Sequence, residues 1–477
     1  MTERRALGET RSPENYQNPS ALPDQKSTMD SGETAVDRIS QLPDCLLLQI
    51  LSLMPTDETL VTSALSKRWR YLWNSLDTFS FSIFDYHEGY VSYVDYVLAH
   101  SVSPKIKKFQ LDSHEPGAYQ SHIDRWFSFA VEKKVENVEL RSNSDEEVCA
   151  LPECLYTCSS LITLVLGFCY FDANVFIAWK SLKSIKLKWM VLSDDHIVNL
   201  LRGCPALETM ELSNFKGFSR LEIRSSKLKR LNLIEYNDEE IDHSLEIVAP
   251  YLQHLEISKS LYGLKCRLVD VSSLVNAKLT FNITCIKEIK YLLDDEVDDE
   301  EDSCRDYHQG FMILVQDYLQ KLSCASKITI GTWFTEVLCM LQFKGVPIPE
   351  LKCKYLTLEL HTKKFSAYGA AGLLRASPDI ETFNIDIAAM HPVANFCCFG
   401  SQDLAKGDNI ELQSWISGFA FPNLKNVKIA ISSRSRICLM DHLKWSYVKT
   451  LFKLSEFLLK NASVLEKFVI ISKRRQY

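Results

Sequence analysis

The chain has 477 residues, 46% of them hydrophobic and 24% charged, which is ordinary for a globular protein and leaves room for two to four domains. Its formal net charge is −7, but eight acidic residues fall in one run at residues 294–302, DDEVDDEED, so the remainder is almost neutral. That balance lacks the basic excess of a nucleic-acid-binding protein, and no apolar run approaches the ~20 residues that a membrane span requires. We therefore expect neither nucleic acid nor a membrane as a partner.

The first residues and the cysteines indicate an intracellular protein. Residues 1–35 are rich in Thr, Ser, Pro, Gln and charged side chains and carry no signal-peptide pattern, so we expect a disordered arm and a location in the cytoplasm, the nucleus or both. The fifteen cysteines include no CxxC pair and no regular framework, which favours reduced and mostly buried thiols.

Residues 36–82 contain an unusually apolar helical segment. Pro43 suits the first position of a helix, where an N–H group has no partner within the helix, and Pro55 ends the same helix after about Met54. One apolar stripe at helical spacing consists of Leu46, Ile50, Leu53 and Met54, and a second consists of Leu47, Leu48 and Leu51. A surface helix needs only one stripe, so two stripes predict burial against its own domain on one side and against a partner on the other.

The segment that follows has the same character. Leu65, Trp69, Leu72 and Leu76 recur at helical spacing, with Trp73 beside them. A module of about 40 residues seldom buries enough surface to fold by itself without a metal, a disulfide or a partner. The alternative is a small helical subdomain that packs on the rest of the chain and needs no partner.

These residues resemble the F-box, in the form that opens plant F-box/leucine-rich-repeat proteins; the matching pieces are DRISQLPDCLLLQILS, the MPT turn and TSALSKRWRYLW. The resemblance implies binding to a Skp-family adaptor, which links F-box proteins to a cullin–RING ubiquitin ligase. By the same resemblance, the adaptor contacts fall on Leu42, Pro43, Leu46, Ile50, Leu51, Leu65 and Trp69. Apolar anchors of this kind, with Trp among them, are typical of binding hot spots.

A short pattern returns throughout residues 83–400: apolar, two residues, apolar, one residue, apolar. Successive copies begin about 24 residues apart, at Ile106, Val135, Leu161, Leu182, Leu207, Leu228 and Leu252, with a degraded copy at Leu274. This is the period and core of a leucine-rich repeat, in which each unit supplies one short parallel strand and a return segment, and neighbouring units stack into a solenoid. The sequence thus predicts an α/β fold, with a helix from about Asp194 to Leu201 in one return segment.

The pattern continues less regularly after residue 274. Further copies begin at Ala325, Tyr355, Ile380, Leu424 and Leu465, and the 51-residue gap before Ala325 contains the acidic run. That gap spans about two periods, so one repeat is either hidden or replaced there. We interpret the acidic run as a solvated loop between repeats rather than a calcium site, since its spacing is not that of an EF-hand loop.

Residues 401–477 resemble the FBD domain found at the C-terminus of many plant F-box/leucine-rich-repeat proteins, with FLLKNASVLEKFVI as the matching piece. The pattern predicts a strand, a helix at about Ser455–Asn461 and a second strand, which together cap the solenoid as one more repeat. The resemblance implies no chemistry of its own.

The third and fifth residues of each pattern lie between the buried positions and so face the concave side of the predicted sheet. Their charges alternate in sign from strand to strand, which predicts attraction along the sheet and a face poorly suited to polyphosphates. We see no cluster of basic residues of the kind thought to hold a phosphorylated inositol in hormone-receptor relatives. The uncharged positions Thr163 and Val165, next to aromatic residues 168–171, are our candidate target contacts; the alternative is ordinary core and edge packing.

The sequence contains no phosphate-binding glycine loop, no HExxH pair and no GxSxG turn, so we predict a non-enzymatic protein without a metal or cofactor. The favoured function is the substrate-recognition subunit of an SCF-type cullin–RING ubiquitin ligase, with a Skp-family adaptor on the F-box and a protein target on the repeats. Two alternatives remain open. One is a repeat scaffold that delivers nothing for ubiquitination, and the other is a small-molecule receptor on the concave face.

Overall fold

The computed structural model describes residues 39, 41–83, 88–114, 116–142, 148–172, 176–236, 243–261, 264–283, 301–360, 364–387, 418–432 and 452–473. The predicted arm at residues 1–35 and most of the acidic run lie outside the described residues, as does much of the predicted C-terminal domain. The chain divides into two units, residues 1–47 and residues 48–477, and the first is described only at residue 39 and residues 41–47.

Short helices form the N-terminal part of the described chain. Helix α1 (Asp44–Leu51) follows Pro43, as predicted, but it ends before Met54: the N–H groups of Leu53 and Met54 bond to carbonyls three residues back, at 3.1 Å each. Such bonds tighten the last turn of a helix and close it. Helix α2 (Thr56–Val61) begins directly after Pro55. The second predicted helix is instead two 3₁₀ turns, η1 (Thr62–Ala64) and η2 (Trp69–Ser75).

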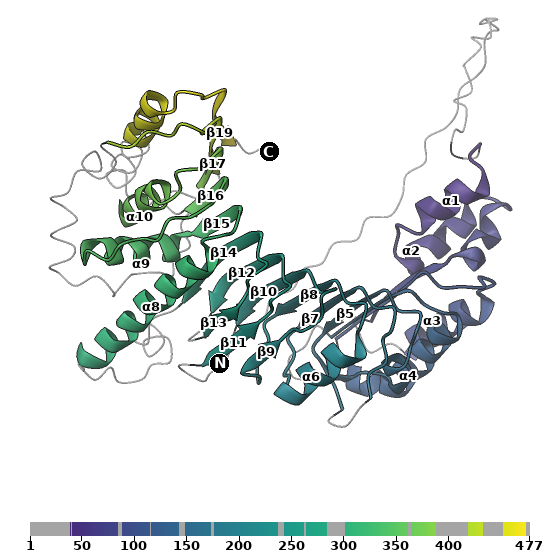
Figure 1. The fold of residues 1–477 in the computed structure, drawn as a ribbon. Coiled ribbons are helices and arrows are strands. Elements are labelled where there is room, and N and C mark those ends of the chain that lie inside the picture. Colours follow the sequence, from purple (N-terminus) through teal and green to yellow (C-terminus); the bar gives the residue numbers. More distant parts are fainter. Residues whose placement is uncertain are drawn as a thin grey trace, which may run out of the picture. The chain divides into compact units, whose positions relative to one another are not determined.

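Among the described residues, fourteen parallel strands form the main sheet, and each strand is hydrogen-bonded to the strand that follows it in the sequence of this sheet (Figure 1). In order they are β1 (Thr78–Ile83), β2 (Lys108–Ser113), β3 (Asn137–Ser142), β5 (Thr163–Gly167), β7 (Ser184–Lys188), β8 (Thr209–Ser213), β10 (Arg230–Tyr236), β12 (His254–Leu261), β14 (Asn276–Ile283), β15 (Lys327–Gly331), β16 (Tyr355–Leu360), β17 (Thr382–Ile387), β18 (Asn426–Ser432) and β19 (Lys467–Lys473). The predicted parallel-strand solenoid is therefore confirmed.

The apolar pattern predicts the first residue of nearly every strand. β8 begins at Thr209, two residues after Leu207, and nearly every other predicted copy has the same offset. The exception is β16, which begins at the predicted start itself, Tyr355; the buried residue that opens this unit is Cys353, 0% exposed. From β1 to β18 the second and fourth residues of each strand of the main sheet, such as Met210 and Leu212 of β8, are buried in the core, whereas Ile470 of the last strand, β19, is 52% exposed. Burial of these rows is the main stabilising contribution to the fold.

The sheet begins earlier than the predicted boundary at residue 82. β1 pairs in parallel register with β2, although its residues fall in the segment predicted as helical. Leu76, Phe79 and Phe81 have the same apolar spacing as the later units and are 2%, 0% and 1% exposed. The first repeat unit thus starts inside the predicted F-box segment.

Helices and a second small sheet pack on one side of the main sheet (Figure 1). The helices are α3 (Glu88–His100), α4 (Pro116–Glu132), α5 (Glu153–Tyr156), α6 (Asp194–Gly203), α8 (Glu301–Leu322), α9 (Thr332–Phe343), α10 (Lys364–Arg375) and one at residues 452–461. The second sheet contains β9 (Arg220–Glu222), β11 (Ser244–Val248) and β13 (Lys265–Asp270), and a two-stranded ladder joins β4 (Cys149–Ala150) to β6 (Cys169–Tyr170). The opposite side of the main sheet, called the open face below, carries the third and fifth positions of the predicted patterns.

A helix replaces a repeat in the long gap of the pattern. β14 pairs directly with β15, which leaves no room in the main sheet for a hidden strand between them. Helix α8 occupies the described part of this connection, and the Tyr318 hydroxyl donates to the carbonyl oxygen of Cys266 in β13 at 2.6 Å. Of the two possibilities left open by the sequence, replacement is correct.

Helices α9 and α10 approach each other through a glycine. An ideal Cβ built on Gly369 of α10 would overlap the carbonyl oxygen of Thr335 in α9, and it would lie 2.7 Å from the carbonyl carbon. Thr335 is 0% exposed, and every residue of α9 from Thr332 to Leu341 is buried. Only a residue without a side chain fits at this contact.

The described cysteines carry free thiols. Cysteine side chains are described at ten positions, and most of them are buried. Burial raises the pKa of Cys204 and of Cys266 to about 12, so both thiols stay protonated at neutral pH.

None of the described helices is long and apolar enough to cross a lipid bilayer.

Candidate functional site

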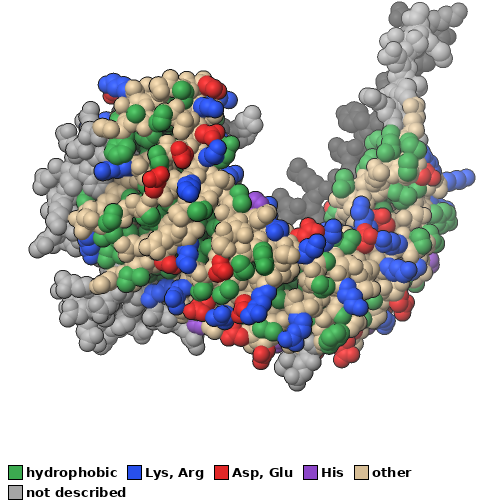
Figure 2. Space-filling model, in the orientation of Figure 1, with side chains coloured by type: hydrophobic (Ala, Val, Ile, Leu, Met, Phe, Trp, Pro, Cys, Tyr) green, Lys and Arg blue, Asp and Glu red, His purple; other side chains and the backbone are tan. Residues whose placement is uncertain are grey.

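An exposed apolar surface lies on the N-terminal helical segment. Ile50, Leu53, Val61 and Leu65 are 44%, 87%, 74% and 68% exposed, and we call these four residues the N-terminal apolar surface. Figure 2 shows apolar side chains gathered over this part of the chain. Leu46, in the first unit, is 41% exposed and lies one helical turn before Ile50 on α1. Exposed large apolar side chains that gather in one region are typical of a protein-binding site.

The other side of the same segment holds the helices in place. Leu51 and Trp69 are 1% and 6% exposed and belong to the core. The hydroxyl oxygen of Thr56, at the start of α2, accepts the backbone N–H of Ser80 in β1 at 2.8 Å. Helix α2 is therefore attached directly to the main sheet, which leaves the N-terminal apolar surface on the outside.

The structure divides the predicted adaptor contacts into two groups. The accessible group comprises Pro43, Leu46, Ile50 and Leu65, which are exposed, and Leu42, which is half-buried. Leu51 and Trp69 form the second group, because they lie on the buried sides of α1 and η2. We assign these two side chains to the core and exclude them from the proposed contact surface.

Two exposed residues were missing from the predicted contacts. Leu53 follows Ile50 by three residues, and Val61 precedes Leu65 by four. Both spacings place side chains on the same side of a helical turn, so the periodicity that selected Ile50 and Leu65 could have selected these neighbours.

Ion pairs connect neighbouring strands on the open face of the main sheet. Lys108 Nζ of β2 lies 3.3 Å from a carboxylate oxygen of Glu139 in β3. Lys186 Nζ of β7 lies 3.1 Å from Glu211 in β8. The predicted alternation of charge along the sheet is confirmed by these pairs, which reduce the net charge that a ligand meets at these strands.

The same pairing extends along the sheet at Lys278. Its Nζ lies 3.2 Å from Glu256 and 3.5 Å from Glu359. Partial burial disfavours the charged amine, but the two carboxylates outweigh that effect and raise the pKa of Lys278. Lys278 therefore stays protonated and links three strands electrostatically.

The candidate target contacts lie on the open face as predicted. Thr163 and Val165 of β5 are half-buried, and Val165 lies in register between Glu139 and Lys186. These two uncharged side chains interrupt the charged row of this face.

Part of the adjacent aromatic run is core, and part is surface. Phe171 is 6% exposed and packs with Tyr156 and Trp179. Phe168, by contrast, stacks on Trp189, with ring centroids 5.2 Å apart and planes 5° from parallel. Trp189 is 44% exposed and was not predicted, because it follows a different strand, β7.

Comparison with known proteins assigns both parts of the chain. Residues 39–81 match the F-box domain family, and residues 123–280 match the family described as "FBD-associated F-box protein At5g56370, LRR repeats". Over 373 residues the chain is 33% identical to the F-box/LRR-repeat protein At3g03360 of Arabidopsis thaliana. The aligned region covers 76% of this chain and 72% of that relative. The chain belongs to the F-box/LRR-repeat protein family. Its relatives from the same plant include the putative F-box/LRR-repeat protein At3g18150, 33% identical over 74% of this chain and 72% of the relative.

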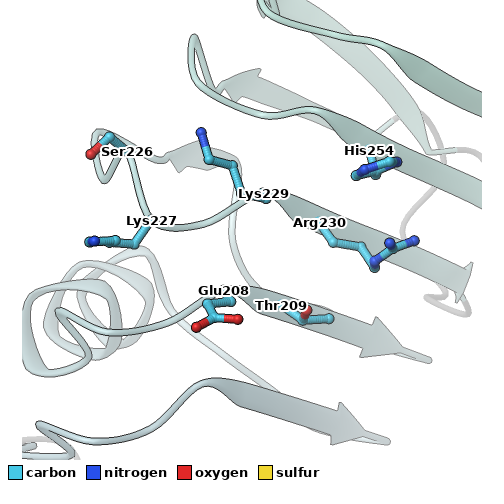
Figure 3. A pocket seen from close by; sticks show the side chains of 7 residues that line it. All are labelled: Glu208, Thr209, Ser226, Lys227, Lys229, Arg230 and His254. Carbon is cyan, nitrogen blue, oxygen red and sulfur yellow. The ribbon is translucent and has the colours of Figure 1, made fainter.

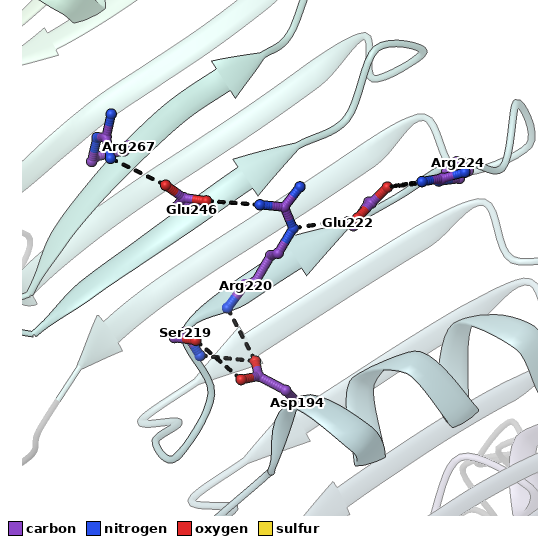
Figure 4. Close-up of polar contacts among 7 residues, drawn as sticks. All are labelled: Asp194, Ser219, Arg220, Glu222, Arg224, Glu246 and Arg267. Atoms are coloured by element: carbon purple, nitrogen blue, oxygen red, sulfur yellow. Dashed lines mark hydrogen bonds and ion pairs between the residues drawn. The ribbon is translucent and has the colours of Figure 1, made fainter.

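On the side of this F-box/LRR-repeat protein opposite the open face, ion pairs cross the second sheet (Figure 4). Arg220 of β9 lies 3.3 Å from Glu222 and 2.9 Å from Glu246 of β11, and Glu246 also pairs with Arg267 of β13 at 3.1 Å. Hydrogen bonds from Arg224 and Arg220 lower the pKa of Glu222. The network joins three arginines to two carboxylates, so each charged group in it has an opposite partner and the pairs link neighbouring strands of the second sheet.

Asp194 connects helix α6 to the same region. Its Oδ1 accepts the N–H groups of Ser219 at 3.0 Å and Arg220 at 3.1 Å, and its Oδ2 accepts the Ser219 hydroxyl at 3.0 Å (Figure 4). Partial burial opposes ionisation, but the hydrogen bonds outweigh it and hold the pKa of Asp194 below its ordinary 3.8. The helix is capped by Ser193, whose hydroxyl oxygen accepts the N–H of His196 at 3.2 Å.

The described part of the F-box/LRR-repeat protein contains no group of three or more His, Cys, Asp or Glu side chains that could hold a metal ion. The chemistry that its surfaces do offer is recognition: exposed apolar side chains at the F-box, and uncharged, aromatic and charged side chains on the repeats.

Proposed function

We propose that this F-box/LRR-repeat protein is the substrate-recognition subunit of an SCF-type cullin–RING ubiquitin ligase. The F-box binds a Skp-family adaptor through the N-terminal apolar surface, with Leu42, Pro43 and Leu46 adding contacts, and the repeats bind a protein target in the cytoplasm or the nucleus. The chain makes and breaks no bonds itself. It holds the target near the transferring enzyme, so that ubiquitin transfer becomes effectively intramolecular.

The observation that carries this proposal is the exposure of the N-terminal apolar surface. Val61 and Leu65 each leave about two thirds or more of their surface in water, while Leu51 and Trp69 behind them are already buried. Full burial of one such side chain contributes about 1.5–3 kcal/mol, so a partner that covers the surface gains a substantial binding free energy. A segment packed only for its own stability has no need of these outward side chains.

The adaptor interaction is tested by co-purification of the full chain with a Skp-family adaptor. The double variant Ile50→Asp/Leu65→Asp puts carboxylates on the exposed surface, and we expect capture to weaken by about 30-fold or more, since hot-spot residues contribute ~2 kcal/mol or above. Val198→Asp is the matched control, because Val198 is 50% exposed on helix α6, away from the F-box. Equal capture by the double variant and the control would refute the proposed adaptor surface.

A second experiment separates target delivery from scaffolding. The half-lives of proteins that co-purify with the intact chain are compared in cells that express the parent chain or the Ile50→Asp/Leu65→Asp variant. A ligase subunit shortens the half-life of its target only when its F-box surface is intact. Target half-lives that are the same with both chains would support a repeat scaffold instead.

We also propose that the target contacts include Thr163 and Val165, together with the exposed Trp189. An uncharged row beside a stacked aromatic pair can bury apolar target side chains that the paired charges of neighbouring strands would exclude. Val165→Lys should weaken target capture without affecting adaptor capture, whereas Val275→Lys, at an exposed position between strands, should leave both unchanged. Undiminished target capture by Val165→Lys would place the target elsewhere.

A further inference from the structure

A basic hollow lies at the beginning of strands β8, β10 and β12 (Figure 3). Its volume is about 440 Å³, and its lining residues are Glu208, Thr209, Ser226, Lys227, Lys229, Arg230 and His254. Strand pairing brings these residues together: Thr209 pairs with Arg230, and Arg230 pairs with His254. Ser226 and Lys227 come from the turn that precedes β10.

The charges in this hollow are not balanced. Lys227, Lys229 and Arg230 supply three cations, and Glu208 is the single carboxylate among the seven lining residues. Glu208 itself lies 3.6 Å from Lys183, which is outside the hollow, so its charge is already shared. Neither Lys227 nor Arg230 pairs with a carboxylate of the described residues, whereas Lys186 and Lys278 of the open face each do. The hollow is therefore a local excess of positive charge, whereas Lys186 and Lys278 are neutralised by their carboxylate partners.

His254 adds an unsatisfied polar atom to the same place. Its Nδ1 is buried and has no hydrogen-bond partner among the described residues. Burial, together with the positive charges of Arg230 and Lys327, lowers the pKa of His254, so the imidazole is neutral at neutral pH. The hydroxyl groups of Thr209 and Ser226 also line the hollow and add hydrogen-bonding groups to those of the cations (Figure 3).

We propose that this hollow binds one phosphate monoester carried by the target protein, as phosphoserine or phosphothreonine. A phosphate monoester brings a charge of about −1.5 to −2 and three strong acceptor oxygens, which match three cations and several donors better than a single carboxylate does. Arg230 can engage two of those oxygens at once, and the lysines supply point charges. The assignment rests on the proposed function, because the phosphate belongs to the protein that the repeats recognise.

The surroundings limit the ligand to a single anionic group. Two positions further along the same strands, Glu211 follows Thr209 and Glu256 follows His254 on the open face. Both carboxylates are already paired with lysines, Glu211 with Lys186 and Glu256 with Lys278, so these lysines are not available to a longer polyanion such as a nucleic acid strand. One phosphate on an otherwise neutral peptide needs only the cations of the hollow.

The experiment measures binding of labelled peptide pools to the purified full chain in complex with its adaptor. The pools share random flanking residues and carry phosphoserine, serine or glutamate at the centre, and inorganic phosphate is titrated as a competitor. Lys227→Gln/Arg230→Gln is compared with Arg202→Gln/Lys467→Gln, which removes the same charge at two exposed positions outside the hollow. Both variants alter surface side chains, and thermal unfolding confirms that each remains folded.

We expect the phosphoserine pool to bind at least tenfold more tightly than the serine and glutamate pools, and Lys227→Gln/Arg230→Gln to abolish most of that difference while the control keeps it. Equal binding of the phosphoserine and glutamate pools, or equal loss in both variants, overturns the proposal. Competition by inorganic phosphate at lower concentration than the phosphoserine pool requires also overturns it, because the ligand would then be a free anion. Adaptor capture by both variants should equal that of the parent chain, so failure here is distinct from failure of the F-box proposal, which Ile50→Asp/Leu65→Asp tests.

Discussion

Gly369→Ala should separate helices α9 and α10 and destabilise the C-terminal repeats. The added methyl group would overlap the carbonyl oxygen of Thr335 and approach its carbonyl carbon to 2.7 Å, where ordinary van der Waals contacts begin near 3.4 Å. The obstacle is buried backbone, which cannot rotate away as the end of a side chain can. One helix must therefore move by more than the roughly 0.7 Å that the carbonyl carbon alone would require, because the carbonyl oxygen lies closer still.

The magnitude follows from two opposing effects. Overpacking a well-packed interior costs about 1–3 kcal/mol, occasionally more. Alanine in place of glycine stabilises a helix by roughly 0.5–1 kcal/mol, which offsets part of that loss. We expect a net loss of about 2 kcal/mol in the free energy of unfolding, since the obstacle at Gly369 is backbone and places the cost in the upper part of its range.

Urea unfolding followed by tryptophan fluorescence measures the effect, because Trp333 of α9 is 2% exposed and reports on this helix pair. Gly89→Ala in helix α3 is the matched control, since an added Cβ there meets nothing within 4 Å. The control should be neutral or slightly more stable than the parent. If Gly369→Ala unfolds at the same urea concentration as Gly89→Ala, the close approach of α9 and α10 is refuted.

Three further predictions concern α6 and the basic hollow. Ser193→Ala removes the hydroxyl that accepts the N–H of His196 and should cost ~1 kcal/mol of stability in urea unfolding; an unchanged midpoint would contradict this role. Because hydrogen bonds hold the pKa of Asp194 below 3.8, its carboxylate stabilises the fold above that value, and the contribution disappears as the pH falls through the lowered pKa. Asp194→Asn should therefore be less stable than the parent at pH 7 and converge with it in strong acid, and a difference that persists there would argue against the ionised carboxylate. Burial is the largest cause of the lowered pKa of His254, and the positive charge of Arg230 also contributes. Arg230→Gln should therefore move that pKa towards 6.5 in an NMR titration, and no movement would show that the two groups do not interact.

The strands were predictable because every repeat unit sends the same apolar positions into one core. β8 begins two residues after Leu207, and most later strands begin at the same distance from the first apolar residue of their pattern. β1 escaped prediction because Leu76 satisfies two periodicities at once: it follows Leu72 at helical spacing and precedes Phe79 at repeat spacing. Only the pairing with β2 decides between them, and that pairing involves residues 30 positions away.

Accessibility was harder to predict than secondary structure. Ile50 and Leu51 are adjacent apolar residues of one helix, yet Ile50 is 44% exposed and Leu51 is 1% exposed. Which of them faces the core depends on how α1 packs against other segments, and the apolar period alone cannot tell a partner-facing stripe from a core-facing one.

The basic hollow was missed for a related reason. The strand pattern selected Arg230 and His254 but passed over Lys227 and Lys229, which precede the strand in a turn. The three cations are close in sequence, but Thr209 and His254 join them only through the pairing of β10 with β8 and β12. Signs that alternate from strand to strand predicted a neutral face, because only the third and fifth positions of each pattern were considered and the lysines before β10 were not.

The bond between Thr56 and Ser80 joins helix α2 to the first strand, with all of residues 56–83 described and no long linker among them. In a ligase, such a junction would limit how far the first repeats can move relative to helix α2. A lysine of the target would be modified when it lies within reach of the transferring enzyme, and lysines near it in sequence but out of reach would not. Site selection on the target would then be a matter of distance.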